Sequence, residues 1–545
     1  MKQHYLEHLS DVTRHQWNDV ALTDYGTDHS YTFGEMAATI LRLHTLFENL
    51  GLRKGDKIAI CSRNCANWAV VYLAITSYEA VVVSILQDFT PEMIDHLVEH
   101  SDAKLLFVGP YVWKELQKQP LKTVEGVINL EDFSGLRTAQ GIAVPTYEQL
   151  EDAFRKKHPR GVTADDFAFK IDPDALSVIN YTSGSLGNPK GVMLSSRSIS
   201  NNVEIGQRML PVDPGQRLVS MLPLAHMFGQ VCEFLYPLCS GTHIYFLTKS
   251  PTPAILLKAM QEVKPYIVVT VPLVIEKIYK RNINPLLSRK AIKFFWKWPL
   301  TGQAIRKKVR KALTKAFGGE LRYFICGGAA ISPDVEACMK DIKFPISVGY
   351  GMTECGPLIG GNPPKYFVAH SGGVPVDNME VKIDNPNEFG VGEILVRGEN
   401  VMLGYYKNEA ATIAAFTDDG WMRTGDLGTM DKHKNIFIKG RNKTMILGAS
   451  GQNIYPEEIE DKLNNLEGVS ESIIVEREGR LVGLVFPDEQ TSKRLPTEAL
   501  RDLMKRNLQS LNKNIPGYSQ VSDIELTNEP FEKTPKQSIK RFLYH

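Results

Sequence analysis

The chain has 545 residues, of which 43% are hydrophobic and 23% charged, which is the composition of a folded globular protein. The length is too great for a single hydrophobic core and indicates several folding units. The formal net charge is +1, so nothing in the overall charge predicts a nucleic acid or an acidic protein as partner.

The N-terminal sequence and the cysteines predict the cellular setting. MKQHYLEHLSDV has no apolar segment of a secretory signal, and apolar runs such as 69–76 and 267–275 are much shorter than a membrane-spanning helix. The seven cysteines include no Cys-x-x-Cys pair. We therefore expect reduced thiols, without a zinc site or disulfide bonds, in a cytoplasmic protein.

Helical and strand patterns alternate from Tyr31 onward. They predict helices within 32–51, 67–80 and 90–103, the second of them amphipathic, and strands within 56–62, 80–86 and 104–109. Further strands that run into Gly-, Ser- or Thr-rich turns are expected within 176–185, 217–225, 267–279, 321–331 and 344–354. This alternation predicts a mainly parallel sheet that binds ligands at the carboxyl ends of its strands.

The expected fold class is α/β, with a large N-terminal domain and a smaller C-terminal one. In the N-terminal domain, over 1–440, βαβ subdomains would extend to about residue 371. Short strand patterns such as 393–398 and 435–440 then predict a small β-rich module over about 372–437. Mixed helix and strand patterns predict a small α+β domain over 441–545.

The segment YTSGSLGNPKG, residues 181–191, has the composition of a phosphate-binding loop. Its glycines let backbone N–H groups converge on an anion, its hydroxyls can donate hydrogen bonds, and its lysine can follow a leaving diphosphate. It is not a Walker A loop, because Pro189 precedes the lysine and a glycine follows it. A flexible surface turn is the alternative. The residues concerned are Thr182, Ser183, Gly184, Ser185, Gly187, Lys190 and Gly191.

Three later motifs add groups that suit a nucleotide. In YGMTECG, Thr353 and Glu354 pair a hydroxyl with a carboxylate, which are oxygen ligands for phosphate and Mg²⁺. Asp426 in GWMRTGDLG can accept both hydroxyls of a ribose, and Arg441 can reach the same ribose or a phosphate. Each has a structural alternative: a helix cap for Glu354, an Asx-turn for Asp426 and a surface cation for Arg441.

The motifs together, in this order and spacing, resemble those of adenylate-forming enzymes and specifically of the acyl-CoA synthetases. They are YTSGSLGNPKG, GYGMTE, GWMRTGDLG and KGRNK followed by SGQNIYPEEIE, and the resemblance covers nearly the whole chain. It implies ATP, Mg²⁺ and CoA, and two half-reactions in one site. A carboxylate attacks the α-phosphate of ATP to give an acyl-adenylate and pyrophosphate, and a thiol then displaces AMP.

The resemblance also implies roles for single residues. The segment from Thr182 to Lys190 would hold the β- and γ-phosphates, Thr353 would touch the α-phosphate, and Glu354 would bind Mg²⁺. Asp426 would hold the ribose, helped by Arg441. Tyr350 would cover the adenine, beside a wall of small residues between adenine and acyl pocket. The wall residues are Gly327, Gly328, Ala329, Gly349 and Gly351.

In this family the last domain rotates between the half-reactions, and the matching pivot is Lys443. The rotation would exchange the C-terminal tail for the loop 449–453, where Ser450 and Gly451 would contact CoA. His226 in PLAHMFGQ matches an aromatic gate beside the acyl pocket, and a core-packed histidine is the alternative.

Two features depart from the family pattern. Leu186 stands where a phosphate-facing hydroxyl is usual, so one hydrogen bond would be missing. The tail, 534–541, leaves the position of the family's catalytic lysine open. Aligned on Thr-Pro the position is Ser538, aligned on Ser-x-Lys it is Lys540, and Lys536 is a third candidate. We favour Lys540, and a merely exposed basic tail is the alternative.

Residues 289–315 contain ten Lys or Arg, no Asp or Glu, and the cluster Phe294, Phe295, Trp296 and Trp298. Basic residues interleaved with aromatic ones suit a peripheral contact with an anionic membrane surface, here the inner surface. A solvated helix with an inward-packed aromatic anchor is the alternative, and no recognised module supports nucleic-acid binding. Similar segments occur in long-chain acyl-CoA synthetases, so the resemblance implies a medium- or long-chain fatty acid.

The expected function is therefore ATP-dependent synthesis of a fatty acyl-CoA. Two alternatives stay open. One is an enzyme that transfers the acyl group to a carrier-protein thiol, and the other is a catalytically impaired nucleotide- or lipid-binding member, suggested by Leu186 and the tail. Chain length and oligomeric state do not follow from the sequence.

Overall fold

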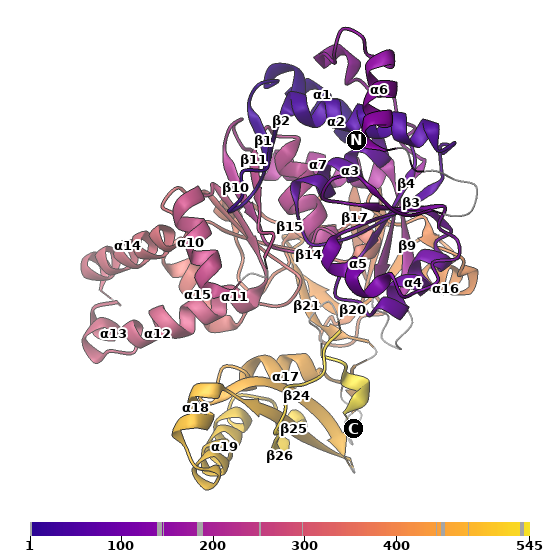
Figure 1. The fold of residues 1–545 in the computed structure, drawn as a ribbon. Coiled ribbons are helices and arrows are strands. Elements are labelled where there is room, and N and C mark those ends of the chain that lie inside the picture. The colour runs from indigo at the N-terminus through magenta and orange to yellow at the C-terminus, as the bar shows by residue number, and fades with distance from the viewer. Residues whose placement is uncertain are drawn as a thin grey trace.

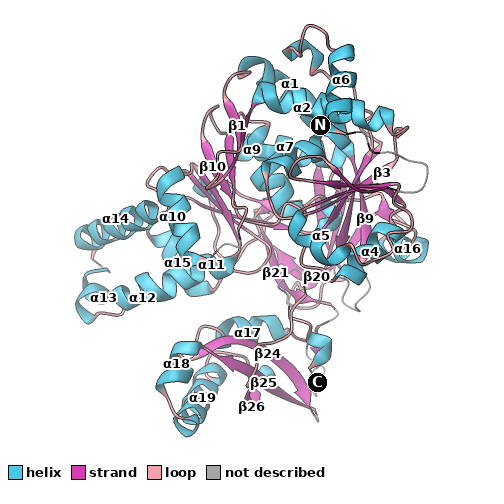
Figure 2. Ribbon diagram, viewed as in Figure 1, coloured by secondary structure: helices cyan, strands magenta, loops and turns pink. Residues whose placement is uncertain are grey.

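The computed structural model describes residues 3–138, 144, 146–182, 189–249, 252–296, 298–442, 444–447, 453–477, 479–534 and 539–544. Figure 1 shows a large N-terminal part, drawn in indigo to orange, and a smaller yellow C-terminal part connected to it below strands β20 and β21. Figure 2 shows that helices cover both faces of the larger sheets. The expected mixed α/β class with a large and a small domain is confirmed.

Two large sheets organise the N-terminal part. Within the described residues the first has eight strands in the order β19-β9-β8-β4-β3-β5-β6-β7. Its central pairs are parallel and its edge pairs antiparallel, as the alternating sequence pattern predicts. The strands are β3 (Lys57–Cys61), β4 (Val81–Ile85), β5 (Ala103–Val108), β6 (Gly126–Asn129), β7 (Gly135–Thr138), β8 (Leu176–Thr182), β9 (Lys190–Ser195) and β19 (Gly404–Tyr405).

The second large sheet, again within the described residues, has nine strands in the order β16-β15-β14-β13-β12-β10-β11-β1-β2. The run from β14 to β1 is parallel throughout, so the carboxyl ends of these strands meet at one edge. The strands are β1 (Val20–Asp24), β2 (Ser30–Thr32), β10 (Arg217–Ser220), β11 (His243–Phe246), β12 (Ile267–Thr270), β13 (Tyr323–Cys326), β14 (Ile346–Gly351), β15 (Leu358–Gly361) and β16 (Val374–Pro375).

The helices begin where the capping residues predict. Thr32 and Thr90 accept hydrogen bonds from the first turns of α2 (Phe33–Asn49) and α4 (Pro91–His100). The other helices of this part include α1 (Tyr5–His15), α5 (Pro110–Leu116), α6 (Tyr147–Lys157), α7 (Ser196–Met209), α10 (Pro253–Val263), α11 (Pro272–Ile278), α12 (Asn284–Leu287), α13 (Lys290–Trp296), α14 (Pro299–Ala316) and α15 (Pro333–Asp341).

The helix expected within 67–80 is present, but the expectation that it is amphipathic is wrong. Every residue of α3 (Ala66–Ser77) is buried, including its asparagine and threonine. The ring centres of Trp68 and Tyr72 lie 6.2 and 5.5 Å from that of Phe234, and α2 packs against α3 as well. A helix enclosed on all sides has no solvent-facing stripe, and its sequence is therefore apolar all round.

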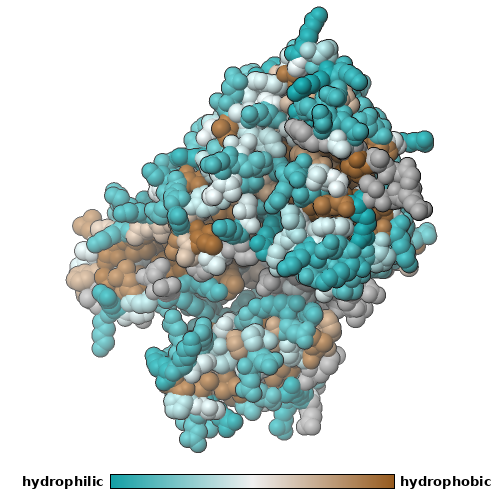
Figure 3. All heavy atoms as spheres, in the orientation of Figure 1, coloured by the Kyte–Doolittle hydropathy of each residue, from teal (hydrophilic) through white to brown (hydrophobic). Residues whose placement is uncertain are grey.

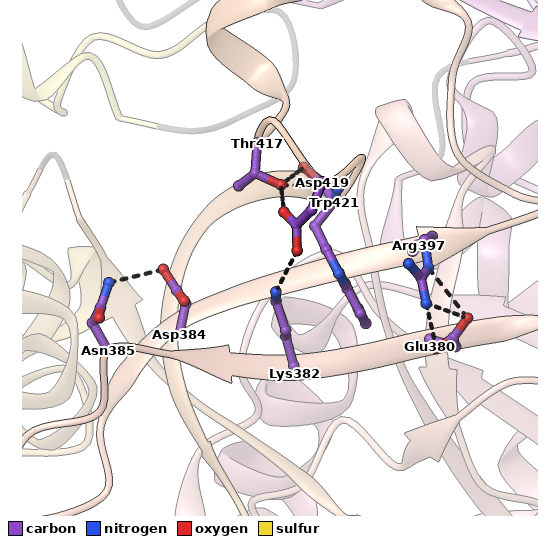
Figure 4. A network of polar contacts seen from close by, with 8 residues as sticks. All are labelled: Glu380, Lys382, Asp384, Asn385, Arg397, Thr417, Asp419 and Trp421. Atoms are coloured by element: carbon purple, nitrogen blue, oxygen red, sulfur yellow. Dashed lines mark hydrogen bonds and ion pairs between the residues drawn. The ribbon is translucent and has the colours of Figure 1, made fainter.

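A four-stranded antiparallel sheet, β17-β18-β20-β21 among the described residues, forms the β-rich part. The strands are β17 (Met379–Asp384), β18 (Gly392–Gly398), β20 (Met422–Met430) and β21 (Ile436–Arg441), and a short helix, α16 (Glu409–Ala415), precedes β20. Figure 4 shows the side chains on its outer face, where Glu380 and Arg397 lie directly opposite each other and pair at 3.0 Å. Lys382 and Arg397 each lie 4.5 Å from the centre of the Trp421 ring. These cross-strand contacts favour the register that places β20 beside β18.

The C-terminal part has its own hydrophobic core, which includes Ile459, Leu463, Leu503 and Leu511. Its elements are β22 (Ile446–Leu447), β23 (Asn453–Ile454), α17 (Pro456–Leu463), β24 (Val469–Arg477), β25 (Arg480–Pro487), α18 (Glu489–Arg494), α19 (Thr497–Asn512) and β26 (Val521–Leu526). All seven cysteines of the chain are free thiols. None of the described helices is long and apolar enough to cross a lipid bilayer.

Candidate active site

Asp426 and Arg441 lie opposite each other on β20 and β21, where they are register partners. The Arg441 guanidinium lies 3.1 Å from Asp426 Oδ1, and the Tyr350 hydroxyl donates a 2.7 Å hydrogen bond to Oδ2. Asp426 is therefore neither in an Asx-turn nor unpartnered, and Arg441 is more than a free surface cation. The motif residues proposed to hold ribose and adenine thus lie together.

The environment of Asp426 determines its protonation. Only 7% of its side chain is exposed, against 65% for Arg441. Burial raises the pKa of the Asp426 carboxyl, and the negative charge of Glu354 raises it further. The charge of Arg441 and the hydrogen bond from Tyr350 lower it, but the net shift is upward. Glu354 lies in the turn directly after β14, the strand that carries Tyr350, so the two acidic motif residues are near the same strand end.

A second cluster connects Glu354 with the lysine of the glycine-rich loop. The Tyr405 hydroxyl donates a 2.9 Å hydrogen bond to Glu354 Oε1, and the Lys190 ammonium lies 4.6 Å from the centre of the Tyr405 ring. Tyr405 is on β19, which pairs with β9, the strand that Lys190 begins. Burial and the nearby Glu354 carboxylate raise the pKa of the Tyr405 phenol well above its usual range.

Tyr405 was not among the residues predicted from the sequence. Glu354 follows β14, together with Thr353 in the single turn Thr353–Cys355, and its backbone carbonyl accepts from Met402 N–H at 2.8 Å. Glu354 thus does not cap a helix. The sequence feature at this position is the aromatic pair in LGYYKN, 403–408. It does not reveal the contact with Glu354, because that contact depends on the pairing of β19 with β9 in the folded protein.

The glycine-rich segment connects the antiparallel strands β8 and β9. Thr182 and Lys190 are register partners, and the Thr182 hydroxyl donates to the Lys190 carbonyl at 3.4 Å. The predicted phosphate-binding residues between them lie outside the described residues: Ser183, Gly184, Ser185 and Gly187, together with Leu186.

The small residues predicted to form a wall lie where β13 and β14 end side by side. A methyl group on Gly351 would lie 2.1 Å from the Pro357 carbonyl oxygen, and one on Gly327 would lie 3.2 Å from the Phe228 ring. Gly328 has φ +86°, in the left-handed region that favours glycine. Gly328 and Ala329 are exposed, and Gly349 is the residue before Tyr350.

His226 lies in the segment that follows β10, and its side chain is only partly buried. It is therefore not a fully packed core histidine. Its neighbour Phe228 contacts the Gly327 end of the wall, which places this segment beside the wall.

Four buried polar side chains that were not predicted from the sequence bind the backbone that leads to His226. Glu233 accepts from Ser220 Oγ at 3.0 Å and from the N–H groups of Met221 and Leu222 at 2.9 and 2.8 Å. Asn64, Asn180 and Gln230 bind backbone groups of residues 222–225. Glu233 and Gln230 belong to a π-helical segment, Gln230–Leu235, a geometry frequent at functional sites.

The favoured tail lysine is not in contact with these clusters in the structure. Lys540 pairs with Glu532 of the same domain at 3.2 Å. Arg541 instead pairs with Glu460 and lies 3.9 Å from Glu457, which accepts from the Thr444 hydroxyl beside Arg441. Other predicted positions lie outside the described residues: Lys443, Ser450, Gly451, Lys536 and Ser538.

Comparison with known proteins decides the family. The AMP-binding enzyme model matches residues 9–406, and the C-terminal domain model of AMP-binding enzymes matches residues 443–544. The chain belongs to the AMP-binding enzyme family. The predicted resemblance to adenylate-forming enzymes is thereby confirmed.

Individual members of the family have low sequence identity to this chain. A chloroplastic long-chain-fatty-acid–[acyl-carrier-protein] ligase of Arabidopsis thaliana is 24% identical, with 94% of this chain and 80% of that protein covered. A long-chain-fatty-acid–CoA ligase of Schizosaccharomyces pombe is 27% identical, with 88% and 75% covered. The solved structure of O-succinylbenzoate coenzyme A synthetase from Bacillus subtilis in complex with AMP has a TM-score of 0.74 at 20% identity, covering 99% of this chain and 98% of that one. The chain is accordingly an adenylate-forming acid–thiol ligase by family.

Proposed function

We propose that this protein activates a fatty acid with ATP and transfers the acyl group to the thiol of CoA. The observation that carries the proposal is a pair of clusters, Tyr350–Asp426–Arg441 and Lys190–Tyr405–Glu354, which are joined at the end of β14 by Tyr350 and Glu354. One offers acceptors suited to a ribose, and the other offers a cation and a carboxylate suited to phosphates.

The first half-reaction joins a carboxylate oxygen to the α-phosphorus of ATP and breaks the bond from that phosphorus to the bridging oxygen of pyrophosphate. Asp426 would fix the ribose, and its pairing with Arg441 and Tyr350 keeps the carboxylate oriented before the nucleotide binds. Lys190 would accompany the negative charge that develops on the departing pyrophosphate.

The residues present fit a magnesium ion. Glu354 uses Oε1 to accept from Tyr405, and a carboxylate retains further acceptor positions for a hard cation. Thr353 adds a hydroxyl next to it in the same turn. A Mg²⁺ held there by Glu354 would offset the negative charge of the phosphates.

In the second half-reaction the CoA sulfur attacks the acyl carbon, the bond to the AMP oxygen breaks, and the thiol proton passes to solvent or a base. The roles of Lys443, Ser450, Gly451 and the tail residues Lys536 or Lys540 belong to this proposal. Lys540 would have to leave Glu532 to reach the α-phosphate, which requires the C-terminal domain to turn.

A fatty acid as substrate is supported by the names of the relatives, since the Arabidopsis and Schizosaccharomyces proteins both carry long-chain fatty acid in theirs. The test is pyrophosphate release with Mg·ATP and a panel of acids from acetate to stearate, with O-succinylbenzoate and a benzoate as ring-bearing controls. We expect release with medium- or long-chain acids and acyl-CoA when CoA is present. Turnover with a ring-bearing acid alone would refute the fatty-acid assignment.

A carrier-protein thiol is the second candidate acceptor, because the Arabidopsis relative is named for that acceptor. Equal concentrations of CoA and of a holo-acyl-carrier protein, offered with the same acid, separate the two. Thioester on the carrier alone would replace CoA in the proposal. ATP binding without pyrophosphate release would instead support an impaired member, as Leu186 and the tail suggest.

A further inference from the structure

A helical hairpin, residues 290–316, projects from the body of the protein. It consists of α13 and α14, which pack against each other and extend to the left in Figure 1, away from the clusters of the candidate site. Figure 3 shows hydrophobic side chains gathered on this projecting end. The proposed reaction gives this surface no role.

The tip of the hairpin exposes large apolar side chains. The exposed fractions are 58% for Phe294, 43% for Phe295, 54% for Trp298 and 83% for Leu300. The Phe294 ring lies 5.4 Å from that of Phe295 and 5.7 Å from that of Trp298, so the aromatics form one cluster. Such a grouped apolar surface on a globular protein usually marks a contact.

The exposure is fixed by the turn between the helices. Trp296 is directed back toward the body, where its indole N–H donates to Asp341 at 3.3 Å and Arg306 lies over its ring and donates to its carbonyl at 3.0 Å. A methyl group on Gly302 would lie 2.3 Å from the Trp296 carbonyl oxygen, so the helices approach closely there. One anchored tryptophan therefore holds its three aromatic neighbours outward.

Basic side chains surround the apolar tip. Arg289 and Lys290 beside it, and Lys307, Lys308, Lys311 and Lys315 along α14, are exposed. Among the described residues none of these six forms an ion pair with a carboxylate, and 289–315 contains no Asp or Glu. Since the whole chain has a formal net charge of only +1, the positive charge is concentrated here.

We propose that the helical hairpin docks on an anionic lipid surface, with its aromatic tip at the level of the headgroups and its lysines against them. Aromatic side chains favour the interface between headgroup and acyl chain, and lysines attract acidic headgroups while their methylene stems lie on apolar surface. A nucleic acid would use the cations and leave the exposed Phe294, Phe295, Trp298 and Leu300 in water. The lipid surface matches both features, and it does not depend on which acid the enzyme activates.

The test is co-sedimentation of the full-length protein with vesicles of phosphatidylcholine, with and without phosphatidylglycerol. We expect binding to the anionic vesicles that weakens with salt, and little binding to neutral ones. Lys307→Gln, Lys308→Gln, Lys311→Gln and Lys315→Gln together should lower the partition coefficient by about 100-fold or more, at about fivefold for each lysine. The matched control changes four exposed lysines elsewhere, Lys122, Lys156, Lys432 and Lys513, to Gln and should keep the wild-type partition.

A second variant, Phe294→Ser with Phe295→Ser and Trp298→Ser, should weaken binding by about tenfold or more while the lysines remain. Unchanged circular dichroism and pyrophosphate release with a water-soluble acid verify that both variants are folded. Equal binding of the control and hairpin variants would overturn the proposal. So would tight binding to duplex DNA that the same four Lys→Gln changes abolish, without any vesicle binding.

Discussion

Tyr405 connects two residues that are 164 positions apart in the chain, Lys190 and Glu354. Its hydroxyl donates a hydrogen bond to the Glu354 carboxylate, and its ring makes a cation–π contact with the Lys190 ammonium. A single phenol thus sets the spacing between the groups proposed to meet phosphate and metal.

Tyr405→Phe removes the hydroxyl and keeps the ring. A hydrogen bond to a charged group contributes about 1.5–3 kcal/mol, so we expect kcat/KM for Mg·ATP to fall about 10- to 100-fold. Steady-state pyrophosphate release measures the change. The neighbouring Tyr406→Phe is the control, because its hydroxyl donates to Asp102 instead. Equal rates for the two variants would show that Tyr405 does not position Glu354.

Asp426 gives a pH prediction whose sign follows from its burial. Burial raises the pKa of this carboxyl, and the ionised form, which is acceptor-only, accepts from both ribose hydroxyls more strongly than the protonated form. When the pH is lowered, the affinity for AMP should therefore begin to fall at a higher pH than it would if Asp426 had the ordinary pKa of an aspartate. Calorimetric titration with AMP across pH checks this. Asp426→Asn should bind weakly and without that pH dependence, whereas Asp431→Asn, on the protein surface, should behave like the wild type.

The residues that the sequence could predict are those whose partners are local or whose motifs are contiguous. Asp426, Arg441 and Tyr350 were predicted to share a ligand, and they lie in contact. Tyr405 and Glu233 could not be predicted, because their importance comes from partners on other strands. Lys540 was predicted to act in the site, and in the structure it pairs with Glu532; its role stays a proposal.

At the scale of elements, strand ends were predictable because apolar runs stop at glycine-rich turns. Strand β13 illustrates this, since the expected range 321–331 contains Tyr323–Cys326, and Gly327 and Gly328 follow directly. The burial of α3 was missed although the sequence carries its signal, because the apolar residues of this helix lie on all of its sides rather than on one face.

The segment 221–226 depends on the side chain of Glu233. Glu233→Ala would leave the Ser220 O–H and two backbone N–H donors without an acceptor, at about 1–3 kcal/mol for each, although Asn64 still donates to Ser220 Oγ. We expect a free energy of unfolding lower by several kcal/mol, together with reduced acid activation. Glu233→Gln keeps an acceptor oxygen and should retain most of both, since burial raises the pKa of Glu233 and favours its neutral form. Chemical denaturation of the two variants measures the difference, and equal losses would contradict this account.

At the scale of the whole molecule, acidic residues of α17 make the C-terminal domain sensitive to pH. Burial, with other carboxylates nearby, raises the pKa of Asp461 to about 7, and burial raises that of Glu460 to about 7 against the opposing Arg541. The folded domain therefore binds more protons than the unfolded chain between the ordinary and the raised values. Its stability should fall as pH rises from about 5 to about 7.

Amide hydrogen exchange of α17 and β24 at about pH 5 and about pH 7 measures this change in the stability of the C-terminal domain. Asp461→Asn should reduce the difference in protection, and Asp502→Asn, at an exposed ion pair with Lys505, should leave it unchanged. Greater protection at the higher pH in the wild type would contradict the assignment.

The central claim is that a carboxylate attacks the α-phosphate of ATP in this site. The most direct test uses a long-chain fatty acid with oxygen-18 in both carboxylate positions, Mg·ATP and CoA, and mass spectrometry of the products. The account predicts one labelled oxygen in each AMP formed and none in pyrophosphate, because the carboxylate oxygen bonded to the α-phosphorus leaves with AMP. Label in inorganic phosphate with ADP as the nucleotide product, or AMP without label, would contradict it.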